Sequence, residues 1–162
     1  MKYASLFLSA VLLAGCSYKE FPAHQQGEKT LDFGMVNSKK IELAEDNSSV
    51  KSYIIVTYLN PISHPLVTQE KEKFLIGIYT ASGNESAPKV VLKNFTVNEF
   101  SKESLNVREV SFNDPLLTLV SSANPWSEYL LVEAPKTDKV DMLIGFENDR
   151  SKRVTASFRK DY

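Results

Sequence analysis

Short apolar segments with a two-residue period run through most of the chain. In residues 73–81 (KFLIGIYTA) the side chains Phe74, Ile76 and Ile78 share one face. Residues 140–146 and 153–158 alternate in the same way on either side of a short polar loop. Such alternation indicates half-buried strands, and the last two segments predict a closing hairpin.

Other segments predict strands by composition rather than by strict alternation. Residues 50–59 (VKSYIIVTYL) are β-branched or aromatic on both faces, which is typical of a central strand covered on both sides. Residues 105–112 change phase partway, which predicts a bulge. Residues 116–121 fit either a short strand or a helical turn. The remaining predicted strands are 31–36, 40–44, 89–97 and 128–134.

The spacing of these segments predicts the fold class. Strands recur about every ten residues, and no long segment has a 3.6-residue period, which favours an all-β antiparallel sandwich. An immunoglobulin-like Greek key is the leading topology, and a small up-and-down barrel is the alternative. The long breaks at 60–72 and 113–126 favour a sandwich with loops at its ends, because a small barrel prefers tight turns.

The N-terminal segment has a different character. Lys2 precedes an apolar run from Leu6 to Ala14, which is too short to span a bilayer. The run ends in Leu-Ala-Gly-Cys16, and it resembles a bacterial lipoprotein signal peptide with its lipobox. The resemblance implies cleavage before Cys16, a diacylglycerol on its sulfur and a fatty acid such as palmitate on the new amine. The alternative is an ordinary cleaved signal with an unrelated thiol.

We therefore divide the chain into a signal peptide (1–15), the lipidated cysteine with a flexible linker (16–30) and one sandwich domain (31–162). Ser17 follows the cysteine, and the absence of aspartate there favours a lipid-anchored protein of the outer membrane. The whole chain has a formal net charge of −1. Cleavage of the signal peptide removes Lys2, so the mature chain would have a formal net charge of −2. Near-neutrality argues against a nucleic-acid partner.

The sequence offers little for catalysis or metal binding. It has two histidines, His24 in the linker and His64 in the 60–72 break, and one cysteine. A zinc site needs three or four ligands, and a serine nucleophile needs a base and an orienting acid. We interpret neighbouring acids such as Glu70 and Glu72 as solvated. We expect no enzyme activity, no cofactor and no metal.

Two segments resemble a known group of proteins. Residues 58–61 (YLNP) and 74–79 (FLIGIY) are similar to small uncharacterised lipoproteins of Campylobacter-type bacteria, some of which are variants of the immunoglobulin fold. The resemblance implies a fold and no active site. Such bacteria glycosylate asparagine with an acid two residues earlier, and Asn47 in Glu45-Asp-Asn-Ser-Ser49 fits that pattern. The alternative for Asn47 is an ordinary polar turn.

The segment 124–129 (NPWSEY) is the best candidate for a contact surface. It holds Trp126, the only tryptophan, with Tyr129 close behind. Aromatic residues on loops are favoured at binding hot spots. The alternative is that Trp126 closes the end of the core.

The predicted function is a lipid-anchored, non-enzymatic binding module of the cell envelope, in adhesion or envelope assembly. Its partner would be another envelope protein, a glycan or a host surface. The alternative is a periplasmic carrier of a small apolar ligand, which requires a cup-shaped barrel.

Overall fold

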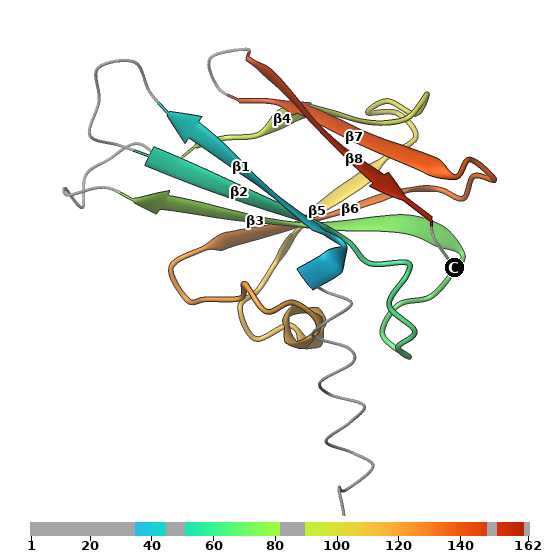
Figure 1. Ribbon diagram of the computed structural model, residues 1–162, viewed down its shortest axis with the longest axis horizontal. Helices are drawn as coiled ribbons and strands as arrows, with labels where there is room; N and C mark the ends of the chain where they lie inside the picture. The colour runs from blue at the N-terminus through green and yellow to red at the C-terminus, as the bar shows by residue number, and fades with distance from the viewer. Residues whose placement is uncertain (1–34, 45–50, 82–89, 149–151, 161–162) are drawn as a thin grey trace, which may run out of the picture.

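The computed structural model describes residues 35–44, 51–81, 90–148 and 152–160. These residues form eight strands and one short 3₁₀ helix, η1 (Figure 1). Their bounds are β1 (Ser38–Ala44), β2 (Lys51–Tyr58), β3 (Lys71–Ala81), β4 (Lys93–Val97), β5 (Asn106–Val110), η1 (Pro115–Leu119), β6 (Glu128–Pro135), β7 (Asp141–Glu147) and β8 (Arg153–Arg159). The strands predicted at 40–44, 50–59, 73–81 and 128–134 are confirmed, as is the hairpin of β7 and β8. Of the strand predicted at 89–97, Lys93–Val97 is confirmed, whereas 90–92 are not in a strand.

The strands form two sheets that pack face to face and do not close into a barrel (Figure 1). One sheet has the order β1-β2-β3-β6-β5 and the other β4-β7-β8, and every pairing is antiparallel. A constant-type immunoglobulin domain has strands A-B-E-D in one sheet and C-F-G in the other. Strands β2 to β8 occupy the places A to G in sequence, and β1 adds one strand beside A. The predicted immunoglobulin-like sandwich is therefore confirmed.

The main core lies between the two sheets. On β3 the inward side chains alternate as predicted, with Phe74 and Ile76 fully buried. The rings of Tyr58, Phe74 and Phe158 contact one another there, with centroids 4.9 to 6.0 Å apart. Other fully buried members from the two sheets are Ile54, Val56, Val97, Val132, Met142, Ile144 and Phe146. This space is filled by protein side chains.

A second, smaller core covers part of the other face of the five-stranded sheet. The loop after β2 and the η1 segment fold back over this face, away from β4, β7 and β8 (Figure 1). Leu75 and Leu131 from the sheet pack there against Leu59, Ile62, Val67, Leu116, Leu117, Leu119 and Val120. The two long breaks thus cover a sheet face instead of lying at the ends of the sandwich. Their apolar residues explain the difference, because they need a surface to bury against.

Local predictions failed at three points. Met35 and Val36 are helical, so the strand predicted at 31–36 is wrong there, and 31–34 lie outside the described residues. No bulge occurs at 105–112, because β5 pairs with β6 without a register shift and ends at Val110. The bulge lies instead in β4, between Lys93 and Thr96. The ambiguous segment 116–121 is mostly the helical turn η1, which Asp114 caps by accepting a hydrogen bond from Leu116 N.

A buried ion pair ties the two sheets together at one end. Lys160, just after β8, donates from Nζ to Glu72 Oε1 of β3 at 2.5 Å and to Thr137 O at 2.6 Å. The Tyr58 hydroxyl donates to Glu72 Oε2 at 2.6 Å, and Thr137 N donates to Oε1 at 3.1 Å. The interpretation of Glu72 as a solvated acid was wrong: it faces inward and is 1% exposed, whereas Glu70 is exposed.

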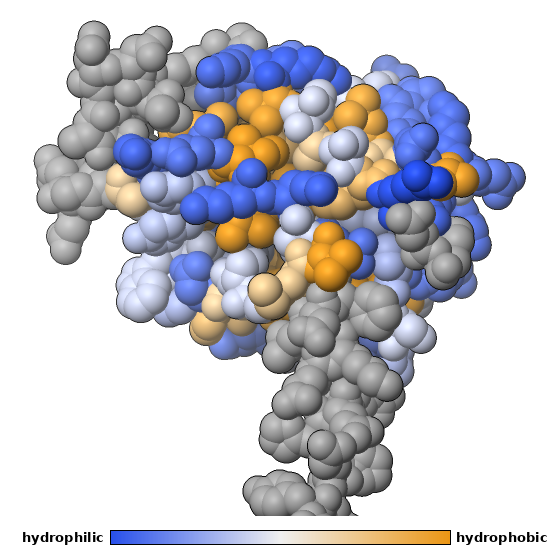
Figure 2. Space-filling model, in the orientation of Figure 1, coloured by the Kyte–Doolittle hydropathy of each residue, from blue (hydrophilic) through white to orange (hydrophobic). Residues whose placement is uncertain are grey.

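The outer surface is mixed in polarity. Figure 2 shows hydrophobic residues on the face in view that are crossed by hydrophilic side chains. The edge strands β1 and β8 carry charged side chains, including Lys39, Lys40, Arg153 and Arg159. Charges on edge strands discourage pairing with other chains. Within the described ranges, no helix is both long and apolar enough to cross a bilayer.

Candidate contact surface

The turn before β6 presents Trp126 to solvent. The Trp126 side chain is 78% exposed, so it does not close the end of the core. Asn124 builds the turn: its Oδ1 accepts hydrogen bonds from Trp126 N and from the Ser127 hydroxyl, both at 3.1 Å. An asparagine side chain that bonds the backbone two residues on is a common way to fix a turn. The tryptophan therefore projects from a turn that is held by its own hydrogen bonds.

The buried Tyr129 side chain fixes this turn through hydrogen bonds to the turn backbone. Its hydroxyl accepts from Asn124 N at 2.6 Å and donates to Asn124 O at 2.9 Å. Immunoglobulin domains use a similar tyrosine corner at strand F, whereas here the tyrosine stands near the start of β6, in the place of strand E. Tyr129 is 4% exposed. The prediction that it contributes to a contact surface with Trp126 is therefore corrected: Tyr129 supports the turn, and Trp126 is displayed.

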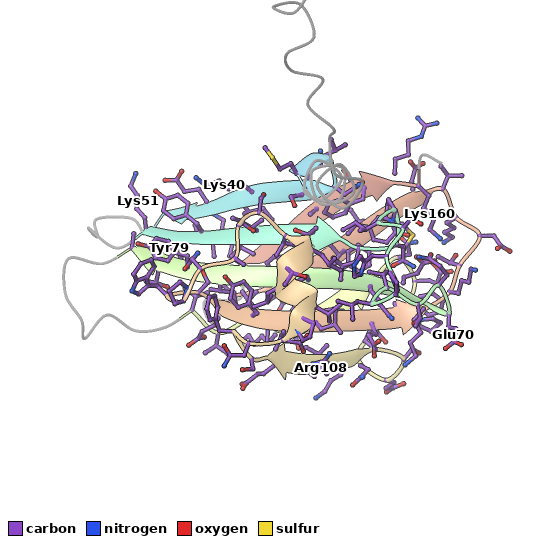
Figure 3. The ribbon with its side chains drawn as sticks, turned by 90° about the horizontal axis from the view of Figure 1, so that it is seen from below. Lys40, Lys51, Glu70, Tyr79, Arg108 and Lys160 are labelled. Atoms are coloured by element: carbon purple, nitrogen blue, oxygen red, sulfur yellow. The ribbon has the colours of Figure 1, made fainter. Side chains whose placement is uncertain are left out.

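A groove lies on the outer face of the five-stranded sheet, beside the same turn. It encloses about 410 Å³. Its floor and one wall come from β1, β2 and β3, and its other wall comes from the turn. The lining residues are Lys40, Tyr53, Ile55, Gly77, Tyr79, Ser122, Asn124 and Ser127. In Figure 3, Lys40 and Tyr79 lie toward one end of the sheet, while η1 crosses its middle.

Two tyrosines form the aromatic part of the groove. Tyr53 and Tyr79 stand directly opposite each other on β2 and β3, and their rings are stacked with centroids 6.3 Å apart and planes inclined by 16°. The Lys40 ammonium lies 4.2 Å from the centre of the Tyr53 ring. This distance is within the range of a cation–π interaction.

Gly77 keeps the groove floor open. It pairs with Tyr129 across β3 and β6, and the Tyr129 ring lies so close that a Cβ at Gly77 would stand 3.1 Å from Tyr129 Cε1. A side chain here would press on the ring that holds the turn. The groove and the Trp126 turn are thus parts of one packed unit.

The charges around the groove are unequal. Glu42 and Lys51 form an ion pair at 3.2 Å, and the hydrogen bond that Lys51 donates to the Glu42 carboxylate raises the pKa of Lys51. Within the part of the chain that the structure describes, Lys40 contacts the Tyr53 ring and has no carboxylate partner. Counting only the residues that the structure describes, the aromatic end of the groove therefore carries one positive charge, that of Lys40, without a carboxylate partner.

The other predicted site residues lie elsewhere. Cys16, Asn47 and His24 fall outside the described residues. His64 lies in the loop after β2, where its Nδ1 accepts from Leu66 N at 3.3 Å. Among the residues with described positions, no three His, Cys, Asp or Glu side chains stand close enough to hold a metal ion.

Sequence reasoning found the Trp126 turn and missed the groove. Tyr53 and Tyr79 were assigned to strands but not to a site, although both are out of phase with the inward residues of their strands. Their position in the alternation was the signal in the sequence that the two tyrosines face away from the main core. It could not reveal that the two rings meet, because the register of β2 on β3 is a tertiary property.

Comparisons with known proteins give little further information. No protein-family model matches the chain, and no curated protein matches it. Among solved structures, the chain is similar to a DUF4426 family protein from Pseudomonas aeruginosa, with 14% sequence identity and a TM-score of 0.34. The alignment covers 75% of this chain and 94% of that protein. A likeness at this level establishes neither a shared family nor a shared function.

Proposed function

We propose that this protein is a lipid-anchored lipoprotein of the cell envelope, held at the outer membrane through Cys16, and that it acts as a non-enzymatic binding module. The observation that carries the binding role is Trp126, a large aromatic side chain that is 78% exposed on a turn fixed by hydrogen bonds. Tryptophan is enriched at the centres of binding interfaces.

The rigidity of the turn supports this role. Ordering a side chain or loop on association lowers affinity, and a turn that is already ordered avoids much of that cost. The buried Tyr129 hydroxyl and the Asn124 side chain supply the order here. The exposure of the apolar tryptophan ring to water is unfavourable, and a binding partner would bury that surface.

The carrier alternative has less support. A carrier needs an interior cavity, and the space between the sheets holds fully buried side chains such as Phe74 and Phe146. We therefore keep the partner that the sequence predicts for a binding module, which is an envelope protein, a glycan or a host surface.

Photo-crosslinking in native membranes tests the proposal. A photoreactive residue replaces Trp126 in the full-length protein, and a matched control replaces Leu143, which is 46% exposed on β7 of the other sheet. We expect a discrete adduct from position 126 that is absent from position 143. Equal labelling at both positions, or none at 126, would contradict the binding role.

The anchor is tested separately by Cys16→Ser. We expect loss of membrane fractionation and of the mass added by lipid. Unchanged maturation and fractionation of this variant would refute the lipid anchor and leave the crosslinking result to decide the binding role.

A further inference from the structure

We propose that the groove between Lys40, Tyr53, Tyr79 and the 122–127 turn binds a carboxylated saccharide. This inference rests on the proposed binding function, because it names the ligand class for the same face of the molecule.

The aromatic rings supply a surface for a sugar ring. A pyranose presents C–H groups on its faces and hydroxyls around its rim, so it requires an apolar platform next to polar groups. Tyr79 is 38% exposed and stacks on Tyr53, whose ring is also covered by Lys40, so the exposed Tyr79 ring provides the platform. Binding sites for small ligands commonly combine aromatic walls with a few placed polar groups.

Hydroxyl groups line the same groove and are available to a ligand. In the described ranges the side-chain hydroxyls of Tyr53, Tyr79 and Ser122 have no hydrogen-bond partner in the protein. Each can both donate and accept. The Ser127 hydroxyl donates to Asn124 and can still accept. Hydroxyl groups that can both donate and accept hydrogen bonds match the hydroxyls around the rim of a sugar ring.

The charge selects an acidic sugar. Lys40 is the cation of the groove without a carboxylate partner among the described residues, whereas the nearby Lys51 is neutralised by Glu42. None of the described residues that line the groove is acidic. A ligand carboxylate near Lys40 would form a charge-assisted contact, which is stronger than a neutral hydrogen bond.

The strand arrangement disfavours an extended peptide as the ligand. A peptide that adds to a sheet needs an open strand edge. The floor strands β2 and β3 are paired on both sides, by β1, each other and β6, so their backbone groups are already used. The volume of about 410 Å³ also lies at the small end of ligand sites, which run from roughly 300 to 1,000 Å³.

Titration calorimetry of the full-length protein in detergent micelles tests this inference, with trigalacturonate as the probe and neutral maltotriose as its control. We expect trigalacturonate to bind more tightly than maltotriose, and its affinity to fall with added salt. Lys40→Gln is expected to weaken trigalacturonate binding by about five- to tenfold, as for one charge-assisted contact in a partly open groove. Lys39→Gln, the adjacent lysine outside the groove lining, should leave it unchanged.

Tyr79→Ala removes the aromatic platform and should weaken trigalacturonate binding. Circular dichroism checks that each variant is folded. Equal binding of both sugars, no binding of trigalacturonate at millimolar concentration, or equal losses in the two lysine variants would overturn the proposal. The proposal would also be overturned if an acidic peptide bound to the protein and trigalacturonate did not. If position 126 crosslinks to a partner while the saccharide fails, only the ligand class is wrong; if both fail, so does the binding role.

Discussion

The buried ion pair between Glu72 and Lys160 gives the sharpest test of how the two sheets are held together. Their side chains are 2% and 6% exposed, and 88 residues separate them in the sequence. The substitution Lys160→Met removes the ammonium and keeps an unbranched apolar side chain. It leaves the Glu72 carboxylate buried, and its remaining hydrogen-bond donors among the described residues are Tyr58 and Thr137 N.

The expected cost follows from that uncompensated charge. Removing one partner of a buried ion pair typically lowers the free energy of unfolding by about 3–5 kcal/mol. Since domains of this kind are stable by roughly 5–15 kcal/mol, the loss is a large fraction of the total. Urea denaturation measures it as a lower midpoint with an unchanged m-value.

Two further variants make the prediction refutable. Lys139→Met removes an exposed lysine that pairs with Glu99 at 2.6 Å, and it should cost far less than Lys160→Met, because solvent screens an exposed ion pair. The double variant Glu72→Gln/Lys160→Met removes the stranded charge, and it should be more stable than Lys160→Met alone. If Lys160→Met costs no more than Lys139→Met, or if Glu72→Gln brings no recovery, the pair is not the tie between the sheets that its geometry indicates.

Four other predictions address the turn, the groove floor and the surface. Tyr129→Phe removes a buried hydroxyl with two backbone partners, and it should lower the free energy of unfolding by about 1–3 kcal/mol in the same assay. Gly77→Ala forces a methyl group to 3.1 Å from the Tyr129 ring and should cost about 1–3 kcal/mol; an unchanged midpoint would show that the ring yields freely. Trp126→Ala should leave the melting temperature within about 2 °C of the parent, because the side chain is 78% exposed, and a large drop would mean that it packs. The hydrogen bond from Lys139 lowers the pKa of Glu99, so their contact is intact at neutral pH and is lost as the pH falls through that pKa; Lys139→Met should raise the Glu99 pKa in an NMR titration.

The sequence alone determined the fold class and most strand positions. Alternation in 73–81 and 140–146 specifies which side chains share a face, because successive residues of a strand point to opposite sides. It also placed Trp126 in a turn between strands. Val140 is an exception to the alternation of 140–146, since it precedes β7 and is 48% exposed.

Only the tertiary structure decided what each face meets. Periodicity identifies the outward residues of β2 and β3, yet it does not state that Leu75 is covered by η1 while Tyr79 lines a groove. It also gave Glu72 and Glu70 the same polar character, although one is buried against Lys160 and the other is exposed. Local sequence sets the direction of a side chain relative to its own strand. Its surroundings depend on strand order, register and loop packing, which join residues that are far apart in the chain.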